Sequence, residues 1–340
     1  MDNEHTHYTG EADVPIEAIQ MIDFEVVAKL PPDTKVSSIV GYGASLWTRT
    51  ARLDGEVDGN AQSYFLKTSF GERGRLIMSS EFHCMTKIYN IMPDLVPKPI
   101  AWGTYSSIPD VHFFLCDFRL MKSCLPNLET FPAKVGDMHR AGISPNGKFG
   151  FDVTIFHGNI PIEHGWSDTW EEYFTRTTRI LFELEQEAQG PNEEIRKLMI
   201  PFFEKVVPRL LRPLETGGRT IQPSLIHGDL WHGNASMDGA TGLPVIFDAA
   251  SFYAHNEYEL GVWRQPWNEI KRNDRLRYHE HFPISQPEQD CDDRNALYAT
   301  RVNILDSILY KGETSYREML IIGMAELVKK FPGGFEAWEA

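Results

Sequence analysis

The sequence predicts an α+β protein with two lobes, in which a small antiparallel β-sheet with one helix precedes a larger, mostly helical lobe. Two observations support this fold class. From about Val36 to Asp117, short apolar segments alternate with turn residues in the manner of β-strands. Beyond Asp117, longer segments carry apolar residues at the spacing of amphipathic helices. A chain of 340 residues fits one large or two modest domains, so each lobe has room for a core of its own.

The first lobe is expected to contain five strands and one helix. The segment KVSSIVGYGASLWTRTARL predicts two strands around a glycine-containing turn, and SYFLKTS predicts a third strand that carries Lys67. A helix from about Arg73 to Met92 should follow, because apolar residues recur there at helical spacing and Pro93 ends the pattern. The segments PKPIAWGTY and VHFFLCDFRL supply the last two strands.

The second lobe is expected to be built mainly from amphipathic helices. The segment WSDTWEEYFTRTTRILFELEQEA places its large apolar residues on one face of a helix. The segment NEEIRKLMIPFFEKVVPRLLRPLE repeats the pattern, and Pro201 and Pro208 are expected to kink or divide it. Further helices are predicted at about 297–310 and 316–330.

The composition limits the classes of partner and compartment. A net charge of −15 argues against binding to nucleic acid and to anionic membranes, because both need a basic surface. No apolar run approaches the roughly 18 residues of a membrane span, and the acidic start MDNEHTHYTGEADV differs from signal and transit peptides. The four cysteines have no CxxC spacing. We therefore expect a cytoplasmic protein with reduced thiols.

Two stretches of the second lobe contain most of the residues capable of chemistry. PSLIHGDLWHGN spans Pro223–Asn234, and LPVIFDAASFYAHNEYELG spans Leu243–Gly261. A purely structural turn is one interpretation, because Asp, Asn and Gly favour turns for backbone reasons. A zinc site of His227, Asp229 and His232 is another, but the helical i, i+4 histidine pair is missing. A serine hydrolase needs a GxSxG turn, which the sequence lacks.

Phosphoryl transfer accounts for the pattern better. In the catalytic loop of protein kinases, an Asp receives the proton of the attacking hydroxyl and an Asn five residues later binds Mg²⁺. Asp229 and Asn234 have this spacing. Asp248 follows the apolar run PVIF, so a strand would hold its carboxylate at a fixed point as a second metal ligand. The pattern therefore favours a protein-kinase-like fold that uses ATP and Mg²⁺.

The first lobe supplies further parts in kinase order. Lys67 would hold the α- and β-phosphates of ATP, and Glu81 on the following helix would orient it. A solvated lysine and a surface acid are the plain alternatives for the two residues taken singly. The stretch GYGAS, with Gly41 and Gly43, comes one strand earlier, where a loop covering the phosphates belongs. This loop lacks the full GxGxxG pattern of protein kinases.

With these motifs the chain resembles the fructosamine kinase family (ketosamine-3-kinases and protein-ribulosamine 3-kinases) of the aminoglycoside phosphotransferase superfamily. The likeness rests on HGDLWHGN and VIFDAASFYAHNEYELG, and it extends to YFLKTS, FFLCDFRLMKS, KFGFDVTIFHGNIPIEHGWSDTWEEYF and RYHEHFPISQPEQDCDDRNALY. It covers most of the chain from about Val36 to Tyr310. The expected domains are a mobile acidic N-terminus (1–20), a nucleotide-binding lobe (21–118) and a lobe with the catalytic loop and substrate site (119–340).

The resemblance implies roles for individual residues. Asp229 would be the catalytic base, with the metal ligands and the phosphate clamp as derived above. Trp231 would face the sugar, and His232, where a small residue is expected, would line the same pocket. The hinge between the lobes would bind adenine through the backbone of Cys116, Asp117 and Phe118.

The implied reaction is transfer of the γ-phosphoryl group of ATP to the 3-hydroxyl of a ketoamine sugar. The ketoamine would be a ribulosamine or fructosamine on glycated lysine or protein, and phosphorylation would lead to deglycation. The acidic balance of the chain suits a cationic ketoamine. Two other classes stay open, namely a kinase of another amino alcohol or aminoglycoside and a nucleotide-binding pseudokinase. Assays with fructosamine, ribulosamine, choline and an aminoglycoside distinguish them.

Overall fold

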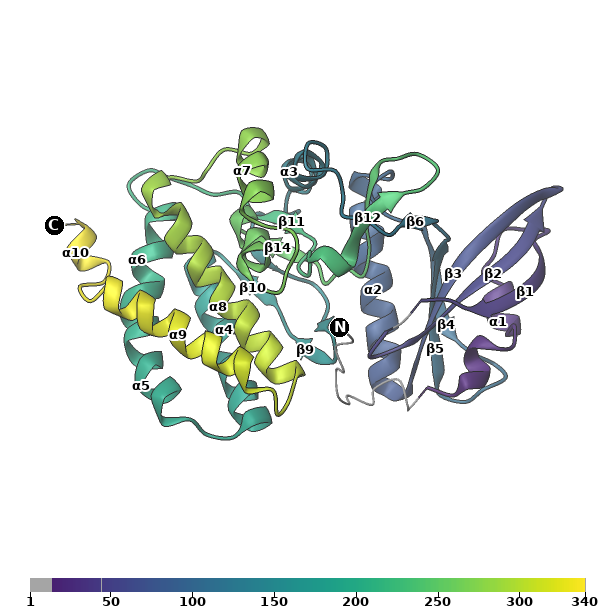
Figure 1. Ribbon diagram of the computed structural model, residues 1–340, viewed down its shortest axis with the longest axis horizontal. Helices are drawn as coiled ribbons and strands as arrows, with labels where there is room; N and C mark the ends of the chain where they lie inside the picture. The colour runs from purple at the N-terminus through teal and green to yellow at the C-terminus, as the bar shows by residue number, and fades with distance from the viewer. Residues whose placement is uncertain (1–13, 44, 340) are drawn as a thin grey trace. The chain divides into compact units, whose positions relative to one another are not determined.

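The structure is a computed structural model that describes residues 14–43 and 45–339. The chain divides into two compact units, whose elements are labelled in Figure 1. The first unit comprises the residues up to Lys122 together with Asp238–Asp248. The second comprises Ser123–Met237 and the residues from Ala249 onward. The α+β class, with a small antiparallel sheet followed by a mostly helical region, agrees with the prediction.

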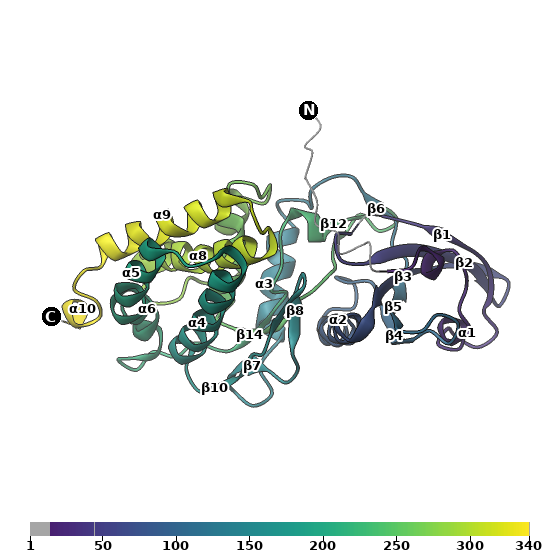
Figure 2. The ribbon, with the colours of Figure 1, turned by 90° about the horizontal axis from the view of Figure 1, so that it is seen from below.

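The first unit is built on an antiparallel sheet with the strand order β1-β2-β3-β5-β4. Its five strands are those expected from the sequence: β1 (Lys35–Gly41), β2 (Arg49–Val57), β3 (Asn60–Phe70), β4 (Pro99–Thr104) and β5 (Val111–Asp117). The expected helix is α2 (Gly71–Ile91), which packs on β3, β4 and β5. Figure 2 shows α2 on one side of this sheet and α1 (Phe24–Val27) on the other.

The alternation of side chains along β3 decides what each face of the sheet carries. Successive residues of a strand point to opposite faces. Leu66 is therefore buried in the apolar core that also contains Val26 and Phe113. Lys67, the next residue, points to the other face, where it meets Glu81 of α2. The strand period thus places one charged side chain beneath the helix, while its neighbours fill the core.

The N-terminal segment packs against the same sheet. Val14 and Ala18 are buried in the first unit's core, and Ala18 lies in a short 3-10 helix, η2 (Ile16–Ile19). Tyr105 donates a hydrogen bond from its hydroxyl to the carbonyl of Ala18 (2.7 Å), and Arg49 Nε donates to the carbonyl of Val14 (2.6 Å). The sequence predicted a mobile segment up to residue 20. Residues 1–13 lie outside the described residues, whereas Val14 and Ala18 of the segment 14–20 are buried in the core of this unit.

Residues 238–248 join the first unit through backbone hydrogen bonds. The N–H of Gly239 donates to the carbonyl of Leu120 (2.7 Å), and the N–H of Ile246 donates to the carbonyl of Leu95 (2.8 Å). The second bond is made by the last residue of β13 (Pro244–Ile246), a short strand that leads directly to Asp248. The sequence did not predict this return of the chain. The remaining short strands here are β6 (Met121–Lys122) and β12 (Ala235–Asp238), the latter reaching the boundary of the two units.

The second unit is mostly helical. Its helices are α3 (Phe131–Ala141), α4 (Trp170–Gln189), α5 (Glu193–Pro201), α6 (Val207–Leu211), α7 (Arg272–His281), α8 (Cys291–Leu309), α9 (Thr314–Lys330) and α10 (Glu336–Glu339). Prolines divide the α5–α6 region as expected, with a π-helical turn at Phe202–Val206 between the two. Helices α3 and α7 were not predicted; α7 is so polar (RNDRLRYHEH) that it has little apolar periodicity. No helix among residues 14–43 and 45–339 is long and apolar enough to cross a membrane.

A small sheet and an aromatic cluster complete the second unit. The sheet has the order β10-β7-β14-β11, with β7 (Phe149–Phe151), β10 (Gly165–Ser167), β11 (Ser224–Ile226) and β14 (Phe252–Ala254). Trp170 is fully buried in the cluster, and its indole N–H donates to the hydroxyl of Tyr298 (2.9 Å). A hairpin of β8 (Ile155–His157) and β9 (Ile160–Ile162) lies apart from the sheet.

Candidate active site

The loop after β11 is fixed by its backbone. Glu259, from the 3-10 helix η6 (Asn256–Arg264), accepts hydrogen bonds from the N–H groups of His227 (2.5 Å) and Gly228 (3.0 Å). Gly228 has φ +85°, and a Cβ there would lie 2.1 Å from the carbonyl oxygen of Ala250. Only glycine fits this close approach of two chain segments. The main chain that carries Asp229 is therefore held by the Glu259 carboxylate and by its close packing on Ala250.

Asp229 is held from two directions. The side-chain amide of Asn234 donates to Asp229 Oδ2 (3.0 Å) and to the Asp229 carbonyl (2.9 Å). On the other side, His157 Nε2 lies 3.6 Å from Asp229 Oδ1. The Asp229 side chain remains 25% exposed, so its carboxylate is oriented and still accessible. These are the properties of a positioned proton acceptor.

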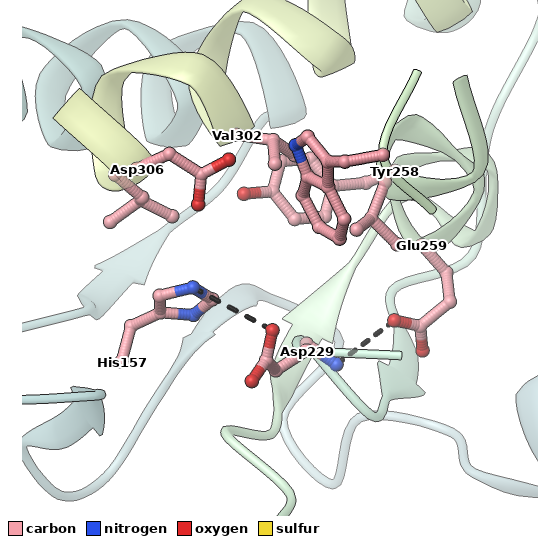
Figure 3. Close-up of a pocket in the computed structure, with 10 residues that line it drawn as sticks. His157, Asp229, Tyr258, Glu259, Val302 and Asp306 are labelled. Atoms are coloured by element: carbon pink, nitrogen blue, oxygen red, sulfur yellow. Dashed lines mark hydrogen bonds and ion pairs between the residues drawn. The ribbon is translucent and has the colours of Figure 1, made fainter. Parts of the chain in front are cut away.

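Asp229 lines a pocket that lies wholly within the second unit. Figure 3 shows Asp229 and His157 on one side of it, with Tyr258, Val302 and Asp306 facing them. The other lining residues are Gly228, Glu259, Val262, Trp267 and Leu305. The cavity volume is about 30 Å³, about twice the minimum that one water molecule needs. It therefore has room for small polar groups of a ligand, and a whole sugar must extend beyond it.

Trp231 and His232 are not among the residues that line this pocket. The Trp231 ring packs edge-on against His232 and against Trp267. His232 Nδ1 accepts the N–H of Glu269 (3.2 Å), and the backbone N–H of His232 donates to Asn268 Oδ1 (3.1 Å). His232 thus ties two loop segments together. A substrate role for these two residues stays a prediction.

The zinc alternative finds no support in the geometry of this loop. His227 Nδ1 accepts the N–H of Asp229 (3.3 Å), and His232 Nδ1 is bonded as described above. Within residues 14–43 and 45–339, no three His, Cys, Asp or Glu side chains are grouped so that they could hold a metal ion. The loop nitrogens are used to order the backbone.

In the first unit, Lys67 is paired with two carboxylates. Its Nζ lies 2.8 Å from Glu81 Oε2 and 3.0 Å from Asp248 Oδ1. Lys67 and Glu81 are buried, whereas the side chain of Asp248 is 43% exposed. Asp248 has φ +59°, an uncommon conformation for a residue other than glycine. Lys67 and Glu81, which the sequence order suggested as a phosphate clamp, are therefore in direct contact.

The charges of this cluster do not balance. Burial disfavours the charged form of Lys67, but Asp248 and Glu81 outweigh it and raise the pKa of the ammonium group. Burial raises the pKa of Glu81 to about 7 against the pull of Lys67, and the nearby Asp248 carboxylate acts in the same direction as burial. The single ammonium group of Lys67 faces the two carboxylates of Glu81 and Asp248, so the cluster has a net negative charge when both acids are ionised. A metal ion bound together with a nucleotide would supply positive charge at this cluster.

The oxygen donors present suit Mg²⁺. Asn234 uses its amide nitrogen on Asp229, so its amide oxygen is the atom that can ligate a cation. Asp248 uses Oδ1 on Lys67, and its half-exposed carboxylate has a second oxygen. Carboxylate and amide oxygens with phosphate oxygens and water form the usual environment of Mg²⁺.

The predicted glycine loop begins at the end of β1, and the predicted hinge lies at the end of β5. Gly41 ends β1, and Gly43 has φ +83°, which a glycine adopts without strain. In the hinge, the N–H of Asp117 already donates to the carbonyl of Lys98 (2.9 Å), and that of Phe118 to the carbonyl of Ser63 (3.1 Å). An adenine ring must therefore use carbonyl groups here, or N–H groups further along the chain. Adenine binding at Cys116, Asp117 and Phe118 stays a prediction.

The sequence reasoning missed several residues around Asp229. His157 and Asp306 face the same pocket, although each lies far from Asp229 along the chain. His157 ends β8 at a two-residue turn, Gly158–Asn159, and the pattern IFHGNI is a recognisable hairpin signal. Asp306 had no such signal except its position, since it is an acid among the apolar residues Ile304, Leu305 and Leu309 of the largely buried helix α8.

Two solved structures establish the class of the fold. A protein from Thermobifida fusca described as a fructosamine-3-kinase has a TM-score of 0.68 and 19% identity, covering 87% of this chain and 95% of its own. A mutant of aminoglycoside phosphotransferase APH(4)-Ia, in complex with AMP-PNP and hygromycin B, has a TM-score of 0.56 and 12% identity, covering 87% and 94%. With the Lys67–Glu81 pair, these likenesses define a kinase-like phosphotransferase fold.

Within that class, the chain belongs to the fructosamine kinase family, whose sequence profile matches residues 49–318. Ketosamine-3-kinase from Mus musculus is 31% identical over 254 residues, covering 65% of this chain and 77% of the mouse protein. The chloroplastic protein-ribulosamine 3-kinase of Oryza sativa subsp. japonica is 30% identical over 212 residues, covering 60% of this chain and 56% of the rice protein. The match thus spans little more than half of the rice protein. The family resemblance inferred from the motifs is confirmed.

Proposed function

We propose that this protein transfers the γ-phosphoryl group of ATP to the 3-hydroxyl of a ketoamine, a sugar joined to an amine as in ribulosamine or fructosamine adducts of lysine. The observation that carries the proposal is the Asp229 carboxylate, oriented by Asn234 and open to a pocket in a chain of the fructosamine kinase family. The names of the mouse and rice relatives, ketosamine-3-kinase and protein-ribulosamine 3-kinase, support the substrate class.

In this proposal the residues of the second unit handle the acceptor. Asp229 receives the proton of the 3-hydroxyl as its oxygen bonds to the γ-phosphorus and the bond to ADP breaks. Asn234 and His157 hold the Asp229 carboxylate in place, and Glu259 holds the backbone beneath it. Phosphorylation of the third carbon would destabilise the adduct, so release of the free amine, that is deglycation, would follow.

The residues of the first unit handle the nucleotide. Lys67, oriented by Glu81, binds the α- and β-phosphates of ATP, and the loop with Gly41 and Gly43 covers them. Asp248 of this unit is a proposed oxygen ligand for Mg²⁺, as is Asn234 of the second unit, and the ion would neutralise phosphate charge when bound. The complex of APH(4)-Ia with AMP-PNP supports ATP as the donor, because that protein has the same fold. A cytoplasmic location is part of the proposal and rests on the composition alone.

An assay panel tests the proposal. The enzyme is incubated with ATP, Mg²⁺ and one acceptor at a time: fructosyl-lysine, ribulosyl-lysine, ribosylated lysozyme, choline or an aminoglycoside. Phosphate incorporation and loss of ketoamine are followed, with Asp229→Asn as the inactive control. Turnover of a ketoamine supports the proposal. Good turnover of choline or the aminoglycoside without any ketoamine turnover would reassign the substrate, and no turnover of any acceptor would favour a pseudokinase.

A further inference from the structure

One buried acid faces the pocket of Asp229 without a partner. Asp306 lies on α8, is 7% exposed, and has an oxygen, Oδ2, that accepts no hydrogen bond from any described residue. Most buried polar atoms in proteins are hydrogen-bonded, and an unsatisfied one costs about 1–3 kcal/mol. Figure 3 shows the Asp306 carboxylate directed into the pocket, opposite Asp229 and His157. A buried acid retained at this cost requires an explanation.

No cation of the protein neutralises Asp306 from within the pocket. The ten lining residues include neither lysine nor arginine. Arg301, on the same helix, is directed elsewhere, because its Nη1 donates to Thr177 Oγ1 and to Thr178 Oγ1 (both 2.8 Å). The indole N–H of Trp267, which also lines the pocket, is near enough to act on Asp306 but forms no hydrogen bond of good geometry with any described residue.

The other groups that face Asp306 are acidic or neutral. Burial and, to a lesser extent, the Asp229 carboxylate raise the pKa of Asp306 well above its ordinary value, while the Trp267 indole acts weakly in the opposite direction. Tyr310 at the end of α8 and Tyr316 on α9 are close enough for Asp306 to raise their pKa values in turn. Burial and the neighbouring Asp229 carboxylate therefore favour the neutral form of Asp306.

We propose that Asp306 forms the amine subsite of this enzyme, in which its carboxylate binds the protonated nitrogen of the ketoamine while Asp229 receives the 3-hydroxyl. The inference rests on the proposed function and deepens it. In a ketoamine the nitrogen and the 3-hydroxyl are separated by only three carbon atoms, so they belong to one end of the sugar and can face two carboxylates of one pocket. Tyr258 and Trp267 line the space between them, and aromatic rings also attract an ammonium group.

The subsite selects a cation at the position of the amine. A neutral sugar offers no partner for the Asp306 carboxylate and leaves it protonated. A ketoamine brings a positive charge, so Asp306 loses its proton on binding and forms a charge-assisted hydrogen bond, which is about twice as strong as a neutral one. Binding of the ketoamine therefore releases a proton from the protein, whereas binding of the corresponding neutral sugar does not.

Kinetics of Asp306→Asn test the subsite with 1-amino-1-deoxyfructose and fructose, which differ only in the amine. Asparagine keeps the shape and removes the charge. We expect KM for the amino sugar to rise about 10- to 100-fold, the range of a lost charged hydrogen bond, with kcat within about threefold. KM for ATP and the kinetics with fructose should not change. The matched control is Asp293→Asn on the same helix, since Asp293 pairs with Lys330 outside the pocket.

Calorimetry separates the subsite from the reaction. Binding of 1-amino-1-deoxyfructose is measured in two buffers of different ionisation enthalpy, so that proton release is counted without turnover. Proton release by the wild type that is lost in Asp306→Asn supports the subsite. Turnover of ketoamines with an unchanged KM in Asp306→Asn and no proton release would overturn the subsite and keep the proposed function. Asp306-dependent binding without turnover would support the subsite and overturn the proposed function. Absence of both binding and turnover would overturn the subsite and the proposed function alike.

Discussion

The ammonium group of Lys67 lies 2.8 Å from the carboxylate of Glu81, and both side chains are buried. The pair joins the third strand of the sheet to the helix that follows it, and Asp248 completes it at 3.0 Å. A buried ion pair is weak evidence for stability, because the loss of hydration offsets much of the attraction. In the proposed function the pair is kept because Lys67 binds phosphate.

The first prediction concerns Lys67→Met. Loss of the ammonium group should abolish measurable ATP binding, and it should destabilise the fold by about 3–5 kcal/mol because Glu81 is left buried without its partner. The double variant Lys67→Met with Glu81→Gln should recover part of the stability but none of the ATP binding. Calorimetric titration with ATP and thermal unfolding are the two measurements. Lys35→Met, at an exposed position of β1, is the control. Normal ATP binding by Lys67→Met would remove the phosphate role.

The second prediction concerns Asp229→Asn. We expect kcat to fall by about 10²- to 10⁴-fold, the usual contribution of a positioned general base. The dissociation constant of ATP should stay within about twofold, because Lys67 and Asp248 are intact. Steady-state kinetics and nucleotide titration give both values. Asp168→Asn is the control, since Asp168 is exposed and pairs with Lys148. Wild-type turnover by Asp229→Asn would show that another group receives the proton.

The third prediction compares two glycines with nearly the same positive φ, +85° at Gly228 and +84° at Gly190. Gly228→Ala should destabilise the protein by more than about 3 kcal/mol, because a Cβ would lie 2.1 Å from the carbonyl oxygen of Ala250. Gly190→Ala should cost only about 1–3 kcal/mol, the penalty of its backbone conformation (φ +84°, ψ 162°) alone, because nothing lies within 4 Å of its Cβ. Denaturant unfolding of both variants measures the difference. Equal losses would mean that the Gly228–Ala250 approach does not constrain the loop.

The fourth prediction is the pH dependence of Asp306→Asn. The pKa of Asp306 is raised in the folded protein, so the acid contributes stability below its ordinary pKa and loses that contribution as pH rises toward the raised value. Asparagine does not ionise. The wild type should therefore match the variant near pH 4 and become less stable than it at higher pH, by up to about 1.4 kcal/mol per pH unit.

Thermal unfolding of both proteins between pH 4 and pH 9, without substrate, checks this dependence. Asp293→Asn should show no such divergence, because Asp293 forms an ion pair with Lys330. Parallel curves for the wild type and Asp306→Asn would mean that Asp306 is ionised in the folded protein at every pH tested.

Local patterns of the sequence were sufficient for the sheet, the principal helices and the order of the reactive residues. The spacing of Asp229 and Asn234 and the place of Lys67 in a strand are properties of short segments, and side-chain periods of about 2 and 3.6 residues express them directly. The polar helix α7 and the strands of three or four residues in the second unit escaped prediction, because packing rather than local preference forms them.

Only the tertiary structure decided which side chains share a pocket. His157 lies on a hairpin and Asp306 on a helix, both far from Asp229 in the sequence, yet all three residues line one pocket. No local periodicity of the sequence predicts this proximity. The same holds for Asp248, which contacts Lys67 because backbone hydrogen bonds return residues 238–248 to the first unit. The sequence by itself determined which reactive residues the chain has and to which family it belongs. The folded chain decided that one acid of α8 is buried without a partner opposite the base, since burial and hydrogen bonding are properties of the packed structure.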